Sequence, residues 1–232
     1  MITRVLALGL VAGLATLLFW QKPNAAPRDI AVVMPSPDAP VLKITVLGTS
    51  LTATYDWPDR VADTLALCLG GRPQISRIAL AGANSTWGLS QIHAVIATQP
   101  DIILIEFAIN DADLRDGVWL WQSAANHRAM GLALQTALPD SRVVLMTMSP
   151  AQGVRGWLRP WLGQYYAQYQ RLAQDMGAGL IDLYPRWLAV PRAQRGLGRD
   201  GLHPDPNVAA KVIVPVITVY LRAALAFTAC PA

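Results

Sequence analysis

Short apolar runs recur along the chain from Val41 onward, and longer segments of mixed polarity separate them. The runs predict buried strands at Leu42–Leu47, Ile75–Leu80, Ile102–Phe107, Val143–Met148 and Leu180–Leu183. The intervening segments predict helices at about Pro58–Leu69, Thr86–Thr98, Trp119–Leu138, Trp161–Met176 and Asn207–Phe227. Continuously apolar strands that alternate with helices are typical of a parallel sheet covered on both faces. The pattern therefore predicts an α/β fold: a doubly wound three-layer sandwich with five parallel strands.

The N-terminus follows a different pattern, because sixteen residues from Val5 to Trp20 carry no charge. At ~1.5 Å per residue they cover about 24 Å, which is short for a membrane span and long for a signal-peptide core. Trp20 and Lys22 suit a bilayer boundary, and Pro27 disfavours cleavage just before it. We expect residues 1–20 to form a hydrophobic helix that serves as an uncleaved signal anchor, with a cleaved signal peptide as the alternative. Either places the domain on the periplasmic side of the inner membrane.

Residues 21–40 contain five prolines and show neither helical nor strand periodicity. Such a composition is typical of a stiff extended linker. We therefore expect a Pro-rich stalk at 21–40, followed by one domain at 41–232.

Composition narrows the class of protein. With 232 residues, 53% of them hydrophobic, the chain suits one α/β domain and excludes extensive disorder. The net charge is +4 and the pI about 9.3, but the arginines are scattered and form no dense basic run. Nucleic acid is therefore not an expected partner, whereas an anionic membrane surface is compatible with the charge.

Four polar or glycine-containing blocks fall at the predicted edge of the sheet where ligands gather in such folds. Ser50 follows the first strand in "GTSL", Gly82 follows the second in "AGANS", and Asn110 follows the third in "AIND". The fourth block, "DGLH", contains Asp200 and His203 and precedes the last helix. Each block alone is explained by a helix cap, a turn or a loop acid. Together they predict one functional site.

The residue types fit nucleophilic catalysis. A serine hydroxyl needs a base, and imidazole is the usual one. His93 and His127 fall within predicted helices, where packing or surface roles are expected, whereas His203 lies in a loop. Asp200, three residues earlier, is placed to fix the imidazole tautomer and stabilise the imidazolium.

A developing oxyanion also needs hydrogen-bond donors. The candidates are the backbone N–H groups of Ser50 and Gly82 and the side-chain amide of Asn110, and one such donor is typically worth ~10²-fold to 10³-fold in rate.

From about Val41 to the end, the chain resembles the SGNH or GDSL-type hydrolases. The four marker residues of that family correspond to Ser50, Gly82, Asn110 and His203, and Asp200 completes a triad. The resemblance implies a flavodoxin-like sandwich and ester hydrolysis or acyl transfer without a metal or cofactor. Two positions depart from the family pattern: Thr49 stands where the first block has Asp, and Ala108 where the third has Gly.

The resemblance predicts a serine esterase that acts on small acyl groups, with O-acetyl groups on a carbohydrate as one candidate substrate. Two alternatives stay open: an accessory or structural subunit of a membrane complex with a vestigial hydrolase domain, and a lysophospholipase or thioesterase.

The two cysteines, Cys68 and Cys230, allow either one disulfide or two separately buried thiols. In the implied architecture the first and last helices are neighbours, which favours the disulfide.

Several other residues are expected to be structural. Glu106, inside an apolar strand, is expected to bond to neighbouring backbone, and Asp111 and Asp113 are expected to cap loops. Four tryptophans remain as candidates: Trp119, Trp121 and the two in the segment 151–163. That segment also contains two arginines. Helix packing is the commoner role of an indole ring, and stacking on sugars or contact with lipid headgroups are the alternatives.

Overall fold

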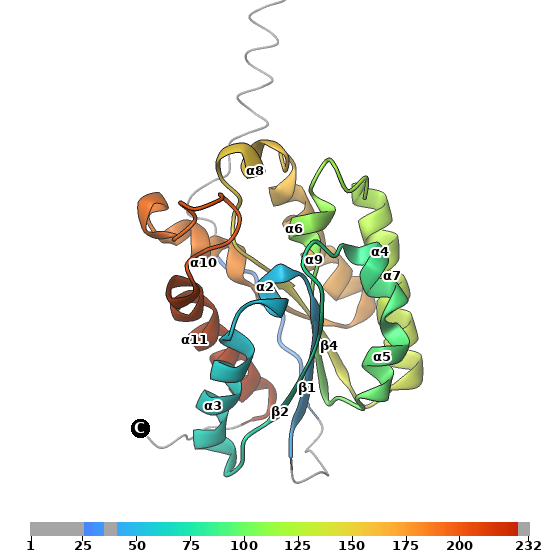
Figure 1. The fold of residues 1–232 in the computed structure, drawn as a ribbon. Coiled ribbons are helices and arrows are strands. Elements are labelled where there is room, and N and C mark those ends of the chain that lie inside the picture. Colours follow the sequence, from blue (N-terminus) through green and yellow to red (C-terminus); the bar gives the residue numbers. More distant parts are fainter. Residues whose placement is uncertain (1–25, 35–40, 227–232) are drawn as a thin grey trace, which may run out of the picture.

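A parallel five-stranded sheet forms the centre of the molecule (Figure 1). The computed structural model describes residues 26–34 and 41–226. The strands are β1 (Lys43–Gly48), β2 (Gln74–Ala79), β3 (Ile102–Glu106), β4 (Arg142–Thr147) and β5 (Gly179–Asp182). Their order is β2-β1-β3-β4-β5, and each neighbouring pair is parallel. Every strand lies within one residue of its predicted bounds, which confirms the predicted fold class.

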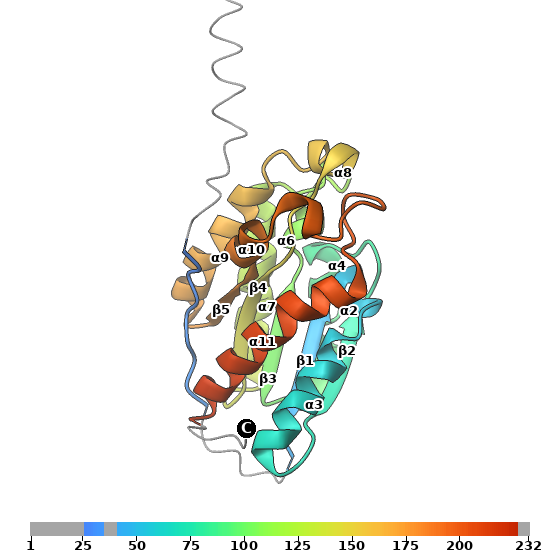
Figure 2. The same ribbon diagram turned by 90° about the vertical axis from the view of Figure 1, so that its left-hand side faces the viewer.

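Helices cover both faces of the sheet (Figures 1 and 2). One face carries α3 (Trp57–Leu69), α10 (Leu183–Ala189) and α11 (Pro206–Ala224), and α3 and α11 lie side by side. The other face carries α4 (Ser85–Ser90), α5 (Ile92–Ala97), α7 (Leu120–Ala137) and α9 (Leu162–Met176). This arrangement confirms that the first long helix and the last one are neighbours. Cys230 lies outside the described residues, so its disulfide with Cys68 stays a prediction.

The core follows the apolar runs. All five residues of β3 are buried, and β1 and β4 are buried except at their first residue. β2, at the edge of the sheet, stays partly exposed along its length. Because both faces of the central strands meet helices, nearly every position on them must be apolar.

The segment before the first strand packs against the domain. Ile30 and Leu180 exchange backbone hydrogen bonds of 3.0 and 2.9 Å as an antiparallel bridge on β5. Val32 and Met34 are buried in the same core as the sheet. Residues 26–34 therefore pack on the domain, although the sequence placed them in a stiff extended linker over 21–40. The predicted anchor, residues 1–20, lies outside the described residues.

Three local differences from the predicted elements concern the helices. The helix expected over residues 86–98 is two helices, α4 and α5, which meet at Gln91. The segment 151–163 contains a short helix, α8 (Gly153–Trp157), and α10 follows β5 directly. Short helices such as these lack the long apolar period that makes a helix visible in sequence.

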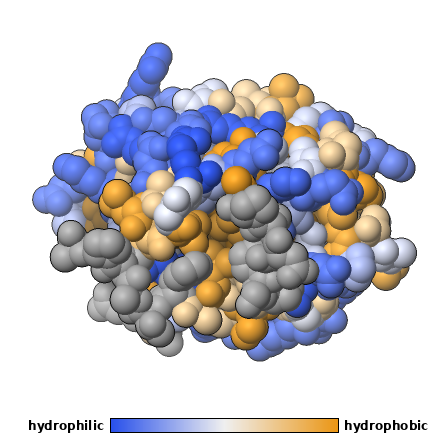
Figure 3. All heavy atoms as spheres, turned by 90° about the horizontal axis from the view of Figure 1, so that it is seen from below, coloured by the Kyte–Doolittle hydropathy of each residue, from blue (hydrophilic) through white to orange (hydrophobic). Residues whose placement is uncertain are grey.

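Within the described ranges, one helix, α11, is long and apolar enough to cross a membrane by length and composition. Its buried residues, among them Ile213, Ile217 and Leu221, belong to the hydrophobic core. At the amino-terminal end of the sheet, seen from below, hydrophilic surface surrounds several apolar areas (Figure 3).

Candidate active site

The turn after β1 positions Ser50. β1 ends at Gly48, Thr49 caps the next helix by accepting a hydrogen bond from Leu51 N–H (3.2 Å), and Ser50 is the first residue of that helix, α2 (Ser50–Ala53). The first N–H groups of a helix have no partner within it. The backbone N–H of Ser50 is therefore not used by α2, and its side chain lies at the carboxyl edge of the sheet.

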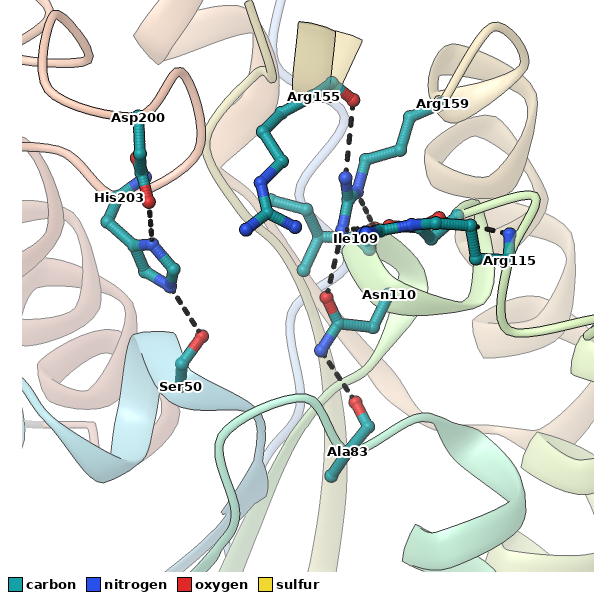
Figure 4. Close-up of polar contacts among 10 residues, drawn as sticks. Ser50, Ala83, Ile109, Asn110, Arg115, Arg155, Arg159, Asp200 and His203 are labelled. Atoms are coloured by element: carbon teal, nitrogen blue, oxygen red, sulfur yellow. Dashed lines mark hydrogen bonds and ion pairs between the residues drawn. The ribbon is translucent and has the colours of Figure 1, made fainter. Parts of the chain in front are cut away.

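Ser50, His203 and Asp200 are hydrogen-bonded in series (Figure 4). Ser50 Oγ lies 2.9 Å from His203 Nε2, and His203 Nδ1 lies 2.6 Å from Asp200 Oδ2. The carboxylate accepts from Nδ1–H, so the tautomer consistent with this geometry leaves Nε2 free to accept from the serine hydroxyl. The structure thus brings together the three residues that the sequence predicted, although 150 positions separate Ser50 from Asp200 in the chain.

Backbone groups hold the Asp200 carboxylate in place. Its Oδ1 accepts from the N–H groups of Leu202 and His203, both at 2.9 Å. Burial raises the pKa of the Asp200 carboxyl, but the hydrogen bonds from His203 and Leu202 outweigh that effect and lower the pKa to about 2. Asp200 is therefore ionised at neutral pH, as an imidazole partner requires.

Two contacts fix the loop that carries His203. Tyr55 Oη donates to Pro204 O (2.7 Å), and Gln152 N–H donates to Gly201 O (2.6 Å). A Cβ at Gly201 would lie 2.2 Å from Gln152 O, and φ is +80° there, so only glycine fits. The "DGLH" block therefore needs its glycine for close packing against the segment that follows β4.

Asn110 stands opposite the Ser–His pair (Figure 4). It lies in the short helix α6 (Ala108–Asp111), and its Nδ2 donates to Ala83 O at 2.8 Å. An Asn amide has two N–H donors, and Ala83 takes one of them. Gly82 is adjacent to Ala83, and among the described residues its backbone N–H has no acceptor. The arrangement leaves donors from Ser50, Gly82 and Asn110 unused around the same edge of the sheet.

A buried ion pair supports α6 from the other side. Arg159 and Asp113 are 2.8 Å apart, with side chains 2% and 1% exposed. Arg159 also donates to Ile109 O (2.7 Å) and, at 3.4 Å, to Asn110 Oδ1. Asp113 additionally accepts from Arg115, and its pKa is lowered because these hydrogen bonds and charges outweigh the effect of burial. Asp113 therefore does more than the loop capping that the sequence predicted.

A second buried network holds the backbone that immediately precedes Asn110 in the chain. Tyr169 Oη accepts from the N–H groups of Phe107 and Ala108, each at 3.0 Å, and lies 2.8 Å from His127 Nε2. His127 Nδ1 lies 2.7 Å from Ser123 O. These contacts are all satisfied if the phenol donates to Nε2 and a neutral imidazole donates to Ser123 O. Burial lowers the pKa of His127, which favours that neutral form.

Asp111 extends this network to the neighbouring loop. Its carboxylate accepts from Ser85 N–H (2.7 Å) and from Ser123 Oγ (2.6 Å). It thereby links the first residue of α4 to α6 and α7, beyond the loop capping predicted for it.

Glu106 lies behind the nucleophile at the end of β3. Its carboxylate accepts from Thr49 N–H (2.6 Å), Thr49 Oγ1 (3.0 Å) and Thr52 Oγ1 (2.9 Å). Burial raises the pKa of Glu106 to about 7, although the hydrogen bonds from Thr49 and Thr52 act in the opposite direction. As predicted, Glu106 bonds to neighbouring backbone, and it does so beside Ser50. Gly48 is required here, because a Cβ would lie 2.3 Å from Glu106 Oε1.

The tryptophans differ from the prediction. Packing was expected for the indole rings, but Trp119, Trp121 and Trp157 are 59%, 71% and 77% exposed, and Trp161 is 37% exposed. The contacts that the sequence did not predict are the ion pair of Arg159 with Asp113 and the bonding of Tyr169 to His127 and to the backbone before Asn110. The sequence pointed to the arginines of 151–163 only as members of that segment and assigned them no contact.

Within residues 26–34 and 41–226, no group of three or more His, Cys, Asp or Glu side chains is placed to hold a metal ion.

A serine, an imidazole and a carboxylate in series, at the carboxyl edge of this parallel sheet, form the arrangement that serine hydrolases use. The profile of the GDSL-like lipase/acylhydrolase family matches residues 46–211, so the chain belongs to that family. This confirms both the resemblance and the assignment as a hydrolase. No curated protein matches the chain.

Solved structures share the fold at low sequence identity. The lipase/acylhydrolase from Enterococcus faecalis has a TM-score of 0.70 at 23% identity, over 79% of this chain and 96% of that one. An acetylxylan esterase from Geobacillus stearothermophilus has a TM-score of 0.65 at 16% identity, over 88% and 100%. A GDSL-like lipase from Bacteroides thetaiotaomicron has a TM-score of 0.61 at 16% identity, over 83% and 92%. At these identities the likeness concerns the fold.

Proposed function

We propose that the protein is a serine esterase that hydrolyses, or transfers, small acyl groups, with Ser50 as nucleophile, His203 as base and Asp200 as the residue that orients it. The observation that carries the proposal is the hydrogen-bonded series Ser50–His203–Asp200, with distances of 2.9 and 2.6 Å. Membership of an acylhydrolase family supports it.

The proposed reaction has two stages. Ser50 Oγ attacks the ester carbonyl while His203 Nε2 accepts the hydroxyl proton, and His203 then returns that proton to the leaving alcohol. Water then enters and attacks the acyl-serine while His203 accepts its proton, and His203 returns that proton to Ser50 Oγ as the acid leaves. Asp200, ionised throughout because of its low pKa, stabilises the imidazolium that forms in each stage.

The negative charge that develops on the carbonyl oxygen would be stabilised by donors already in place. These are the backbone N–H groups of Ser50 and Gly82 and the second amide N–H of Asn110. Because α6 is held by the Arg159–Asp113 pair and by Tyr169, the Asn110 donor would not need to reorganise during the reaction, which is what makes such donors effective.

Carbohydrate O-acetyl groups are the proposed substrates, supported by the exposed indole rings of Trp157 and Trp161, which offer flat faces for sugars, and by the shared fold with an acetylxylan esterase.

We also propose that residues 1–20 tether the domain to the inner membrane on the periplasmic side, as the uncharged run from Val5 to Trp20 suggests.

A fluorophosphonate probe tests the proposal directly, because it reacts covalently with an activated serine. The expected result is labelling of the folded protein at Ser50, mapped by mass spectrometry. Absence of labelling would contradict the proposal and favour an accessory subunit with an inactive domain. Comparing acetate release from acetylated glycans with fatty-acid release from lysolipids would then separate an esterase from a lysophospholipase.

A further inference from the structure

Two segments that border the proposed site are basic and contain no acidic residue. They are 151–163, which follows β4, and 188–199, which leads into the loop of His203. Together they contain five arginines, Arg155, Arg159, Arg192, Arg195 and Arg199. Elsewhere the charges of the chain are mixed, so this concentration of one sign is local.

A pocket of about 280 Å³ lies between the two segments. Its lining includes Gln152, Trp157, Arg159, Arg192 and Arg195. Its walls contact both sides of the site, because Gln152 N–H donates to Gly201 O, and Arg159 lies 3.4 Å from Asn110 Oδ1. The pocket is therefore next to the place where an ester would react.

Most of the positive charge in this region is not neutralised. Arg159 is paired with Asp113, but in the described part of the chain Arg155, Arg192 and Arg195 form no ion pair. Arg195 donates to the carbonyl oxygens of Val190 and Leu188, and Arg192 contacts Gln152 Oε1 at 3.3 Å. Neutral partners such as these hold a guanidinium in position and leave its charge available.

Arg155 is the arginine that extends toward the reacting groups. In Figure 4 its side chain comes from α8 and points to the space between His203 and Asn110. It is also close enough to Arg159 for the two charges to repel. Burial lowers the pKa of Arg159, Asp113 opposes that effect, and Arg155 lowers the pKa further.

On the other wall of the pocket, the charges of Arg192 and Arg195 also repel each other. Burial lowers the pKa of Arg195, and the neighbouring charge of Arg192 adds to that effect. An anion bound between these groups would relieve the repulsion on both walls. Two further features suit a ligand: Gln152 Nε2 is buried without an acceptor among the described residues, and the Trp157 ring is 77% exposed.

We infer that the alcohol part of the substrate carries an anionic group, a carboxylate or a phosphate, which binds in this pocket. This rests on the proposed esterase function. The alcohol is the part concerned because His203 must protonate its oxygen as it leaves, and the pocket is next to the His203 loop: Arg192 and Arg195 line it from the segment that leads into that loop, and Gln152 bonds to Gly201 O. Guanidinium groups bind both anions through paired N–H donors.

Three matched aryl acetates test the inference: 4-acetoxybenzoate, 4-acetoxyphenyl phosphate and the uncharged 4-acetoxybenzamide. Each kcat/KM is divided by the rate constant for hydrolysis of the same ester by hydroxide, which removes differences between the leaving groups. At least one anionic ester should exceed the amide by about tenfold, since a charge-assisted hydrogen bond contributes at least that much. The advantage should shrink as salt is added. The better anionic ester identifies the anion as carboxylate or phosphate.

Two variants locate the effect, Arg155→Gln and Arg192→Gln. Each should lower the ratio of anionic to neutral kcat/KM about tenfold. Arg171→Gln is the matched control, because it removes the same charge from an exposed position on α9. It should leave the ratio unchanged.

The outcomes separate this inference from the proposed function. If the amide is hydrolysed as fast as both anionic esters in a Ser50-dependent reaction, the esterase stands and the anionic pocket is wrong. An anionic preference that survives in both arginine variants also overturns the pocket. If none of the three esters is hydrolysed and Ser50 is not labelled by fluorophosphonate, the proposed function fails, and the inference fails with it.

Discussion

The two sides of the candidate site are held in different ways. On one side, Asp200 and His203 are about one-third exposed, and a loop held by Tyr55 and Gln152 carries them. On the other side, Asn110 is buried, and the side chains of Arg159 and Asp113 that support it are almost fully buried.

The difference follows from what each side would do. Proton transfer puts a charge on the imidazole, and burial would penalise that charge, so contact with solvent is an advantage there. A donor to an oxyanion must already point in the right direction before charge develops, and a buried, fully bonded network provides that rigidity. We therefore expect changes on the first side to affect activity alone, and changes on the second side to affect both activity and stability.

The largest effect is expected from Ser50→Ala, which removes the hydroxyl that contacts His203. Loss of the nucleophile should lower kcat for an aryl acetate by about 10⁴-fold or more, as with other triad serines. The melting temperature should change little, because the hydroxyl bonds only to His203 among the described residues. Ser90→Ala, which removes an exposed hydroxyl on α4, is the control. Undiminished turnover in Ser50→Ala would rule out this serine as nucleophile.

On the buried side, Asn110→Ala should lower kcat by about 10²-fold to 10³-fold, because one oxyanion donor is lost. It should also lower the free energy of unfolding, since Ala83 O and Arg159 each lose a partner. Steady-state kinetics would measure the first effect and urea unfolding the second. Asn207→Ala, at an exposed position, is the control. A loss of stability with normal kcat would show that Asn110 is structural only.

Tyr169→Phe probes the network further from the reacting groups. It removes the only acceptor that the described residues provide to Phe107 N–H and Ala108 N–H, which should cost about 1–3 kcal/mol for each group left unpaired in the interior. A smaller loss of kcat should follow as the α6 backbone loosens.

Tyr184→Phe is the matched control for that change, because the Tyr184 hydroxyl is buried without a partner among the described residues. Its removal should be neutral or stabilising when unfolding is measured in urea. If Tyr169→Phe and Tyr184→Phe lowered the free energy of unfolding equally, the hydrogen bonds of Tyr169 would not be the cause of the loss.

The smallest effect is expected at Glu106, and it should appear as a pH dependence. The pKa of this carboxyl is 4.5 in its ordinary state and about 7 in the folded protein. Between these values the folded state binds more protons than the unfolded state, so stability should fall as the pH rises from 4.5 to 7. Glu106→Gln, which does not titrate, should show a weaker fall when urea unfolding is repeated across that range. Parallel curves for the two proteins would exclude a titrating Glu106.

Much of the fold was predictable because the strands are buried on both faces. A strand such as β3 must then be apolar at every position, which makes it visible as a continuous run. The predicted site residues were visible for a related reason, since each stands directly after a strand or in a loop before a helix, and the sheet brings those ends together. The short helix α8 and the break between α4 and α5 were not predictable, because these helices are too short to show a helical repeat of apolar residues.

The sequence by itself determined the five strands, the edge at which a ligand would bind, and the residues that could perform acyl transfer there. Only the tertiary structure decided the contacts between distant segments. It showed that Trp157 is exposed instead of packed, that Arg159 is buried against Asp113, and that Tyr169 and His127 hold the backbone before Asn110. The physical reason is that the environment of a polar or aromatic side chain is set by its neighbours in space, whereas a local pattern records only neighbours in the chain.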